Sequence, residues 1–289
     1  MEVYEPPVDQ LLRLGEIDEF EPEGWFDYRT LGIGPEQVPD LIRMSVDQDL
    51  RGREGVGDEY YAPYHAWRCL GQLRAESAIP ALVGIFANQA EDDYDEWITE
   101  EIPGVLAMIG PATIPELTRL LEDEQASSNA REHAVESLVE VARYHPEARD
   151  PVVEILTRVI ERAERQAPEL NAFLVCGLLD LRAKEAAGAL ERAFAGGFVD
   201  ECICGSWYDV WEQLELEGEP PPRPERPPGI FGRSSWQEFS PRIEPPPMPS
   251  SPREAGKPLD IRPPDERKDR NKARKKLEQK SKGKGGKRR

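Results

Sequence analysis

Few residues of this chain have the types and the spacing that chemistry on a substrate requires. Cys202 and Cys204 form a C-x-C pair, and the three histidines, all more than 50 residues earlier in the chain, are His65, His133 and His145. A zinc site needs three or four ligands within tetrahedral reach of one another. The pair is therefore expected to be two packed, reduced thiols, and the alternatives are a metal site or a redox pair.

The histidines have no pattern that indicates catalysis. His65 stands among aromatic residues on one predicted helix, namely Tyr60, Tyr61, Tyr64 and Trp67. This cluster could line an aromatic pocket, but we expect it to be the buried face of the first repeat. His133 follows two charged residues and is predicted to be solvated. His145 precedes Pro146 at a predicted helix end, where an imidazolium favours the helix dipole.

Carboxylates are abundant, and two runs of them were considered as acid–base candidates. They are Glu91-Asp92-Asp93 with Asp95-Glu96, and Glu122-Asp123-Glu124. Such pairs can transfer protons when burial raises the pKa of one of them. Both runs are predicted to lie in loops, where carboxylates are solvated, and the first lacks the ligand spacing of a calcium loop. No phosphate-binding glycine loop, dinucleotide fingerprint or nucleophile elbow occurs, so no catalytic residue, metal or cofactor is predicted, and the protein is not expected to be an enzyme.

The charge of the chain is divided between two regions of opposite sign. Residues 267–289 hold 13 Lys/Arg and 2 Asp/Glu, whereas the whole chain has a net charge of −19, so residues 1–266 carry −30. A body this acidic repels nucleic acid and anionic membrane surfaces. The tail cations considered for binding are Lys272, Arg274, Lys275, Lys276, Lys280, Lys282, Lys284, Lys287, Arg288 and Arg289.

The basic tail could neutralise phosphates with release of counterions. It contains no aromatic residue to stack on bases, so any contact with RNA, ribosomes or DNA would be independent of sequence. The tail could instead associate with the acidic body of its own chain, or have no defined role.

An internal repeat underlies the fold prediction. The segments 70–86 and 178–194, offset by 108 residues, are identical at eight of seventeen positions. A third copy lies between them, because Ile79-Pro80 recurs as Ile114-Pro115, and a weaker copy contains Val153, Leu156, Val159 and Ile160. In each copy one helix ends, a short turn follows, and a second helix carries apolar residues at helical spacing. Paired helices repeated every 35 to 38 residues are typical of an all-α solenoid, in which each pair buries its apolar face against its neighbours.

The repeat resembles a known family. The pattern Ala66-Trp67-Arg68-Cys69-Leu70-Gly71-Gln72-Leu73, then Ala78-Ile79-Pro80-Ala81-Leu82, is similar to HEAT-like repeats of the phycobilin-lyase type over roughly residues 59–195. The resemblance implies a scaffold fold and, as a remote alternative, a chromophore lyase. Residues 171–214 resemble the end of bacterial HEAT-like proteins of unknown function, through Leu178-Leu179-Asp180-Leu181, Ala193-Phe194, Val199-Asp200 and Gly205-Ser206-Trp207.

Four regions are predicted along the chain. Residues 1–34 form an acidic cap with a short helix near 8–14, and residues 35–217 form the HEAT-like repeat domain. Residues 218–266 form a Pro-rich disordered linker with an apolar island near Phe231, and residues 267–289 form the basic disordered tail. The acidic start is unlike a signal peptide, and no apolar stretch could span a bilayer. A cytoplasmic protein without membrane contact is therefore expected.

The favoured function is a protein-interaction scaffold without enzymatic activity, with the tail as an electrostatic anchor. The second helices of the repeats are expected to line a concave surface that binds an unknown and possibly basic protein partner. The candidate exposed residues there are Glu116, Arg119, Glu154, Arg158, Glu161, Glu191 and Arg192. The alternative function is that of a nucleic-acid- or ribosome-associated protein, which would bind through the tail.

Overall fold

The fold was described from a computed structural model, which describes residues 4–16, 25–51, 57–87 and 96–224. These residues all belong to the first of two compact units, Met1–Met248. Within the described ranges every regular element is a helix and none is a strand, which confirms the all-α class. Most of the acidic run 91–96, most of the Pro-rich segment with its apolar island, and the basic tail lie outside the described residues.

The N-terminal region contains short helices that lie against the first long one. They are η1 (Val8–Arg13), η3 (Tyr28–Leu31), α1 (Val38–Ser45) and α2 (Gln48–Arg51). The predicted short helix near 8–14 is therefore a 3-10 helix. Its Val8 and Leu11 are buried, and both η1 and α1 pack against α3 (Ala62–Gln72).

Four helix pairs follow, and each has the same internal design. The first helices are α3, α5 (Glu96–Ile109), α7 (Ser128–Tyr144) and α9 (Pro168–Asp180). The second helices are α4 (Ile79–Ala87), α6 (Ile114–Glu122), α8 (Arg149–Ile160) and α10 (Ala187–Ala195). A three-residue 3-10 turn precedes each second helix: η6 (Glu76–Ala78), η7 (Pro111–Thr113), η8 (Pro146–Ala148) and η10 (Lys184–Ala186). Successive second helices therefore begin 35, 35 and 38 residues apart.

The two copies that are most alike in sequence also share an unusual backbone geometry. Arg74 and Arg182, which occupy equivalent positions, both have a φ of 50° in the left-handed region. The amide that follows each of them donates back to the first helix, from Ala75 to the Leu70 carbonyl and from Ala183 to the Leu178 carbonyl. Such a 6→1 hydrogen bond closes a helix end and turns the chain towards the second helix. The repeated sequence thus encodes a repeated turn.

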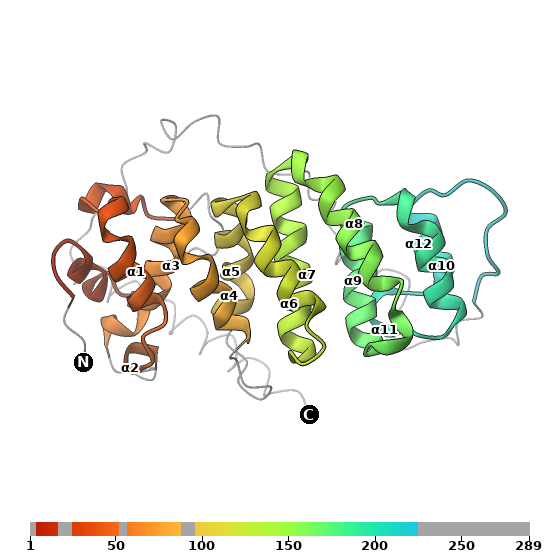
Figure 1. Cartoon of the computed structure of the whole chain (residues 1–289), viewed down its shortest axis with the longest axis horizontal. Helices are drawn as coiled ribbons and strands as arrows, with labels where there is room; N and C mark the ends of the chain where they lie inside the picture. The colour runs from red at the N-terminus through yellow and green to blue at the C-terminus, as the bar shows by residue number, and fades with distance from the viewer. Residues whose placement is uncertain (1–3, 17–24, 52–56, 88–95, 225–289) are drawn as a thin grey trace, which may run out of the picture. The chain divides into compact units, whose positions relative to one another are not determined.

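The helices form two rows (Figure 1). In one row α3, α5, α7 and α9 pack on one another in chain order, and in the other α4, α6, α8 and α10 do the same. The apolar residues between the rows form one continuous buried core, which includes Leu82, Leu117 and Leu156 at 0% exposure. Leu117 lies three residues after the start of α6, and Val152 lies three residues after the start of α8. In the weaker copy of the repeat Val152, rather than Val153, is therefore equivalent to Leu117, and both valines are buried.

Small residues permit close approach within the first row. A Cβ on Gly71 would lie 3.4 Å from Val105 and Met108 of α5, so this glycine faces the next first helix rather than its own partner α4. A Cβ on Gly177 of α9 would lie 2.9 Å from Val139 of α7. Two short helices, α11 (Glu201–Cys204) and α12 (Trp207–Gln213), follow the last pair, and α12 packs on α10 with Val210 and Leu214 buried. None of the described helices is long and apolar enough to cross a membrane.

Candidate protein-binding face

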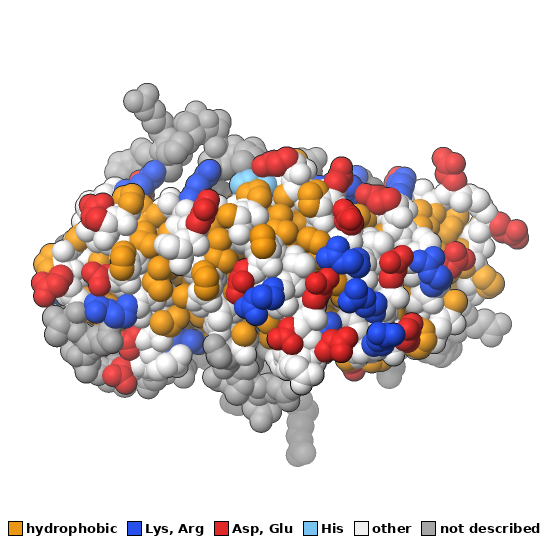
Figure 2. Space-filling model, in the orientation of Figure 1, with side chains coloured by type: hydrophobic (Ala, Val, Ile, Leu, Met, Phe, Trp, Pro, Cys, Tyr) orange, Lys and Arg blue, Asp and Glu red, His pale blue; other side chains and the backbone are white. Residues whose placement is uncertain are grey.

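The seven residues predicted to form a binding surface all lie on the second-helix row. Glu116 and Arg119 belong to α6, Glu154 and Arg158 to α8, and Glu191 and Arg192 to α10, while Glu161 caps the C-terminal end of α8. We call this surface, formed by α6, α8 and α10, the second-helix face. Figure 2 shows acidic and basic side chains interleaved over these helices.

An open groove of about 630 Å³ runs along the side of α8 that faces the last repeat. It brings together three of the seven predicted residues, Glu154, Arg158 and Glu161, with four that were not predicted: Asp150, Val153, Thr157 and Glu185. The other four predicted residues do not line it. The groove walls therefore present four carboxylates and one guanidinium, and a cationic ligand suits this charge.

The arginines of this face are largely held by carboxylates of the neighbouring repeat. Arg158 lies 3.0 Å from Glu122 at the end of α6, and Arg192 lies 3.2 Å from Glu161. Arg149 lies 2.8 Å from Glu185 of η10. These exposed pairs contribute only about 0–1 kcal/mol each to stability. For recognition, each pair neutralises one cation and one carboxylate of the face, so the charge of the face depends on the carboxylates that remain unpaired.

Two carboxylates of the face keep their charge uncompensated. Glu154 and Glu191 are exposed, and neither side chain forms an ion pair or hydrogen bond with a described residue. By contrast, Arg119 is paired with Glu116 at 2.5 Å, and this pairing holds the pKa of Glu116 below its usual range. Glu154 is the uncompensated charge that lies inside the groove.

The run Glu122-Asp123-Glu124, which was considered for acid–base work, has structural contacts instead. Glu122 pairs with Arg158, and Asp123 accepts a hydrogen bond from the Gln125 amide at 2.9 Å. All three side chains are exposed, as predicted.

The prediction that His133 is solvated is wrong, because its side chain is only 7% exposed. Its ring stacks on Phe86 with centroids 5.0 Å apart. The charged residues before His133 indicated a solvent-exposed position. However, α7 packs against α5, α6, α8 and α9 and is buried around most of its circumference. His145 is half-buried, and its Nε2 lies 2.9 Å from the carbonyl oxygen of Ala107 in α5.

His65 is buried, as expected, and fastens the N-terminal region to α3. Its Nδ1 lies 2.7 Å from the Tyr28 hydroxyl, and its Nε2 lies 3.0 Å from the Gly15 carbonyl oxygen. Burial lowers its pKa to about 4, against the opposing hydrogen bond to Gly15. The neutral ring is thus a packing residue that bridges two segments of the N-terminal region.

A buried ion pair between α3 and α5 was not predicted. Arg68 and Glu101 are 3% and 0% exposed, and the Arg68 guanidinium binds both carboxylate oxygens of Glu101. The Trp67 indole N–H also donates to Glu101, at 2.8 Å, and the guanidinium lies 4.5 Å from the centre of the Trp25 ring.

The cysteines differ in their surroundings. Cys202 is exposed, whereas Cys204 is buried, and burial raises the pKa of its thiol to about 12. Burial also raises the pKa of Cys176 to about 11, so both thiols are protonated at neutral pH. Among the described residues no group of three or more His, Cys, Asp or Glu side chains is arranged to hold a metal ion.

Comparisons with known proteins give a family without a function. No curated protein matches the chain, and no solved structure matches it. A family model described as a protein of unknown function, DUF1186, matches residues 37–220, which contain all four helix pairs and the second-helix face. Because this match spans more than half of the chain, the protein belongs to the DUF1186 family.

Proposed function

We propose that this protein is a scaffold without enzymatic activity, built as a HEAT-like α-solenoid. Four helix pairs with equivalent turns at intervals of 35, 35 and 38 residues support this architecture. So do the two rows, in which first helices pack on first helices and second helices on second helices in chain order. The cytoplasm is the proposed compartment, since all four cysteines are free thiols.

The partner that suits the second-helix face is a basic segment of another protein. The observation that carries this proposal is the groove beside α8, in which Glu154 keeps its charge unpaired while Asp150 and Glu185 share the single cation Arg149 and Glu161 pairs with Arg192. The guanidinium that lines the groove, of Arg158, is itself paired with Glu122. A lysine- or arginine-rich segment would meet Glu154 first, because Glu154 has no competing cation among the described residues.

The test is the anisotropy of a labelled Lys/Arg-rich peptide titrated with the full chain at two salt concentrations. Glu154→Lys combined with Glu161→Lys should weaken binding at least tenfold, and salt should weaken wild-type binding as screening predicts. The matched control is Glu212→Lys with Glu217→Lys, two exposed residues near α12 that change the net charge by the same amount. Equal losses in both double variants, or preference for an acidic peptide, would contradict the proposal.

The second candidate function is association with RNA, ribosomes or DNA through residues 267–289. It is favoured by the 13 Lys/Arg of that segment, which lies outside the described residues. Truncation after residue 266 should then abolish co-sedimentation with ribosomes. Unchanged co-sedimentation of the truncated chain would exclude this role for the tail.

A further inference from the structure

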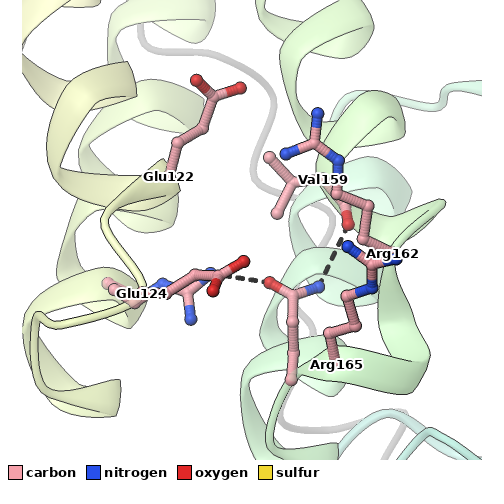
Figure 3. A pocket seen from close by; sticks show the side chains of 7 residues that line it. Glu122, Glu124, Val159, Arg162 and Arg165 are labelled. Atoms are coloured by element: carbon pink, nitrogen blue, oxygen red, sulfur yellow. Dashed lines mark hydrogen bonds between the residues drawn. The ribbon is translucent and has the colours of Figure 1, made fainter.

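A second, smaller hollow lies on the opposite flank of α8, between the end of α6 and the turn that follows α8 (Figure 3). Its enclosed part measures about 10 Å³, which is close to the room that one water-sized group needs. Seven residues line it: Glu122, Glu124, Arg131, Val159, Arg162, Arg165 and Gln166. Three arginines therefore meet at one place on a chain whose first 266 residues carry a net charge of −30.

Arg131 is the buried member of the three. Its side chain reaches the hollow from α7, and the residue is only 8% exposed. Its Nε donates to the Leu121 carbonyl at 2.8 Å, and its Nη2 donates to the Gln166 amide oxygen at 2.7 Å. Gln166 is fixed in turn by its own donation to the Val159 carbonyl at 3.0 Å. Arg131 is thus held rigidly by neutral acceptors.

The charge of Arg131 has no paired anion. No described carboxylate forms an ion pair with it, and burial lowers its pKa against the opposing influence of Glu124 and Asp123. Removing a charge from water without a paired counter-charge is costly. An anion that enters the hollow would offset this cost.

The other two guanidiniums lie at the opening. Arg162 and Arg165 are exposed and extend from the end of α8 and from η9 (Ala163–Arg165). The Arg162 side chain forms no ion pair or hydrogen bond with a described residue, and the Arg165 side chain has only a 3.9 Å contact with its neighbour Glu164. Figure 3 shows both arginines on one wall, facing Glu122 and Glu124 across the gap.

The wall formed by Glu122 and Glu124 contributes less negative charge to the hollow than two unpaired carboxylates would. Glu122 is already bound, at 3.0 Å, to Arg158, which does not line the hollow. Glu124 is then the one lining carboxylate whose charge is not committed elsewhere among the described residues. Three guanidiniums against one such carboxylate leave the hollow cationic.

From this arrangement we infer that the mouth of the hollow binds an oxyanion, a phosphate or carboxylate group, of which one oxygen enters towards Arg131 at the base while Arg162 and Arg165 hold the rest at the rim. Planar guanidiniums present N–H pairs that match the geometry of both groups. The ligand has the opposite charge to the basic segment proposed for the groove. The two proposals are therefore independent, and either can fail while the other holds.

The experiment follows the arginine Nε–Hε signals of the full chain by NMR during titration with inorganic phosphate or with acetate at constant ionic strength. The Nε–H of Arg131 is suited to this because its hydrogen bond to Leu121 slows exchange with water. We expect a saturable shift of that signal, with a Kd of about 1 mM for so small a ligand. Arg162→Glu combined with Arg165→Glu should raise the Kd at least tenfold.

The control is Arg119→Glu with Arg192→Glu, which changes the net charge equally on exposed residues outside the hollow. This control should leave the Kd within twofold of wild type. Saturation by acetate alone would identify a carboxylate of a partner as the ligand, and saturation by phosphate alone would identify a phosphate group. A shift that does not saturate, or an equal change in both double variants, would overturn the inference.

Discussion

The buried ion pair between Arg68 and Glu101 offers the largest effect of a single substitution. Replacing Glu101 with Gln removes the carboxylate charge but keeps the side chain's shape. It takes the counter-charge of Glu101 away from the Arg68 guanidinium, which is 3% exposed, and it weakens the acceptor of the Trp67 indole. Breaking one partner of a buried pair costs about 3–5 kcal/mol. A domain is stable by only about 5–15 kcal/mol, so this loss is a large fraction of the total.

Urea unfolding followed by circular dichroism and tryptophan fluorescence measures this loss. The urea concentration at the midpoint of unfolding should fall, while the slope of the unfolding free energy against urea concentration stays unchanged, as for a simple loss of stability. Arg68→Met combined with Glu101→Gln should recover most of the loss, since this pair carries no unpaired charge and the Gln amide oxygen still accepts from the Trp67 indole. Arg192→Ala, which breaks an exposed pair, should cost less than about 1 kcal/mol. A loss below about 1 kcal/mol for Glu101→Gln would refute the reasoning.

Three further predictions concern stability, each measured by urea unfolding. Arg182→Gly should stabilise the protein by about 0.5–1 kcal/mol, because it relieves the left-handed backbone at φ 50°; a destabilised variant would contradict this. Gly177→Ala should cost about 1–3 kcal/mol, because its Cβ would lie 2.9 Å from Val139. Gly188→Ala, whose Cβ would lie 3.6 Å from the Arg192 guanidinium, should instead stabilise by up to about 1 kcal/mol; equal effects of the two variants would be inconsistent with the packing. The pKa of His65, lowered to about 4 by burial, means that the unfolded chain binds the proton more readily, so stability should fall as pH drops below about 6.5, by about 2 kcal/mol at pH 5. His65→Gln should remove this part of the pH dependence, and an unchanged dependence would show that another group causes it.

The repeats were predictable because they depend on short-range signals. The apolar spacing and the prolines at Pro80 and Pro115 mark second helices that the structure places at Ile79–Ala87 and Ile114–Glu122. Helical periodicity shows which face of a helix is apolar, and a duplicated turn keeps its sequence along with its geometry. These features need no knowledge of what each helix packs against.

The contacts between repeats could not be predicted in the same way. Arg158 meets Glu122 and Arg68 meets Glu101 only after the helices stack, and nothing in the local sequence selects one carboxylate among many. The burial of His133 was missed for the same reason, since it depends on the helices packed around α7. Arg131 is not among the predicted binding residues, yet it lies at the base of the cationic hollow.

Hydrogen exchange of the full chain, measured with and without a saturating Lys/Arg-rich peptide, tests whether the groove beside α8 receives a basic partner segment. We expect slower exchange in α8, over residues 149–160, and in residues 184–195, with α1 and α3 unchanged. Protection confined to the N-terminal helices, or no protection anywhere at saturation, would contradict it.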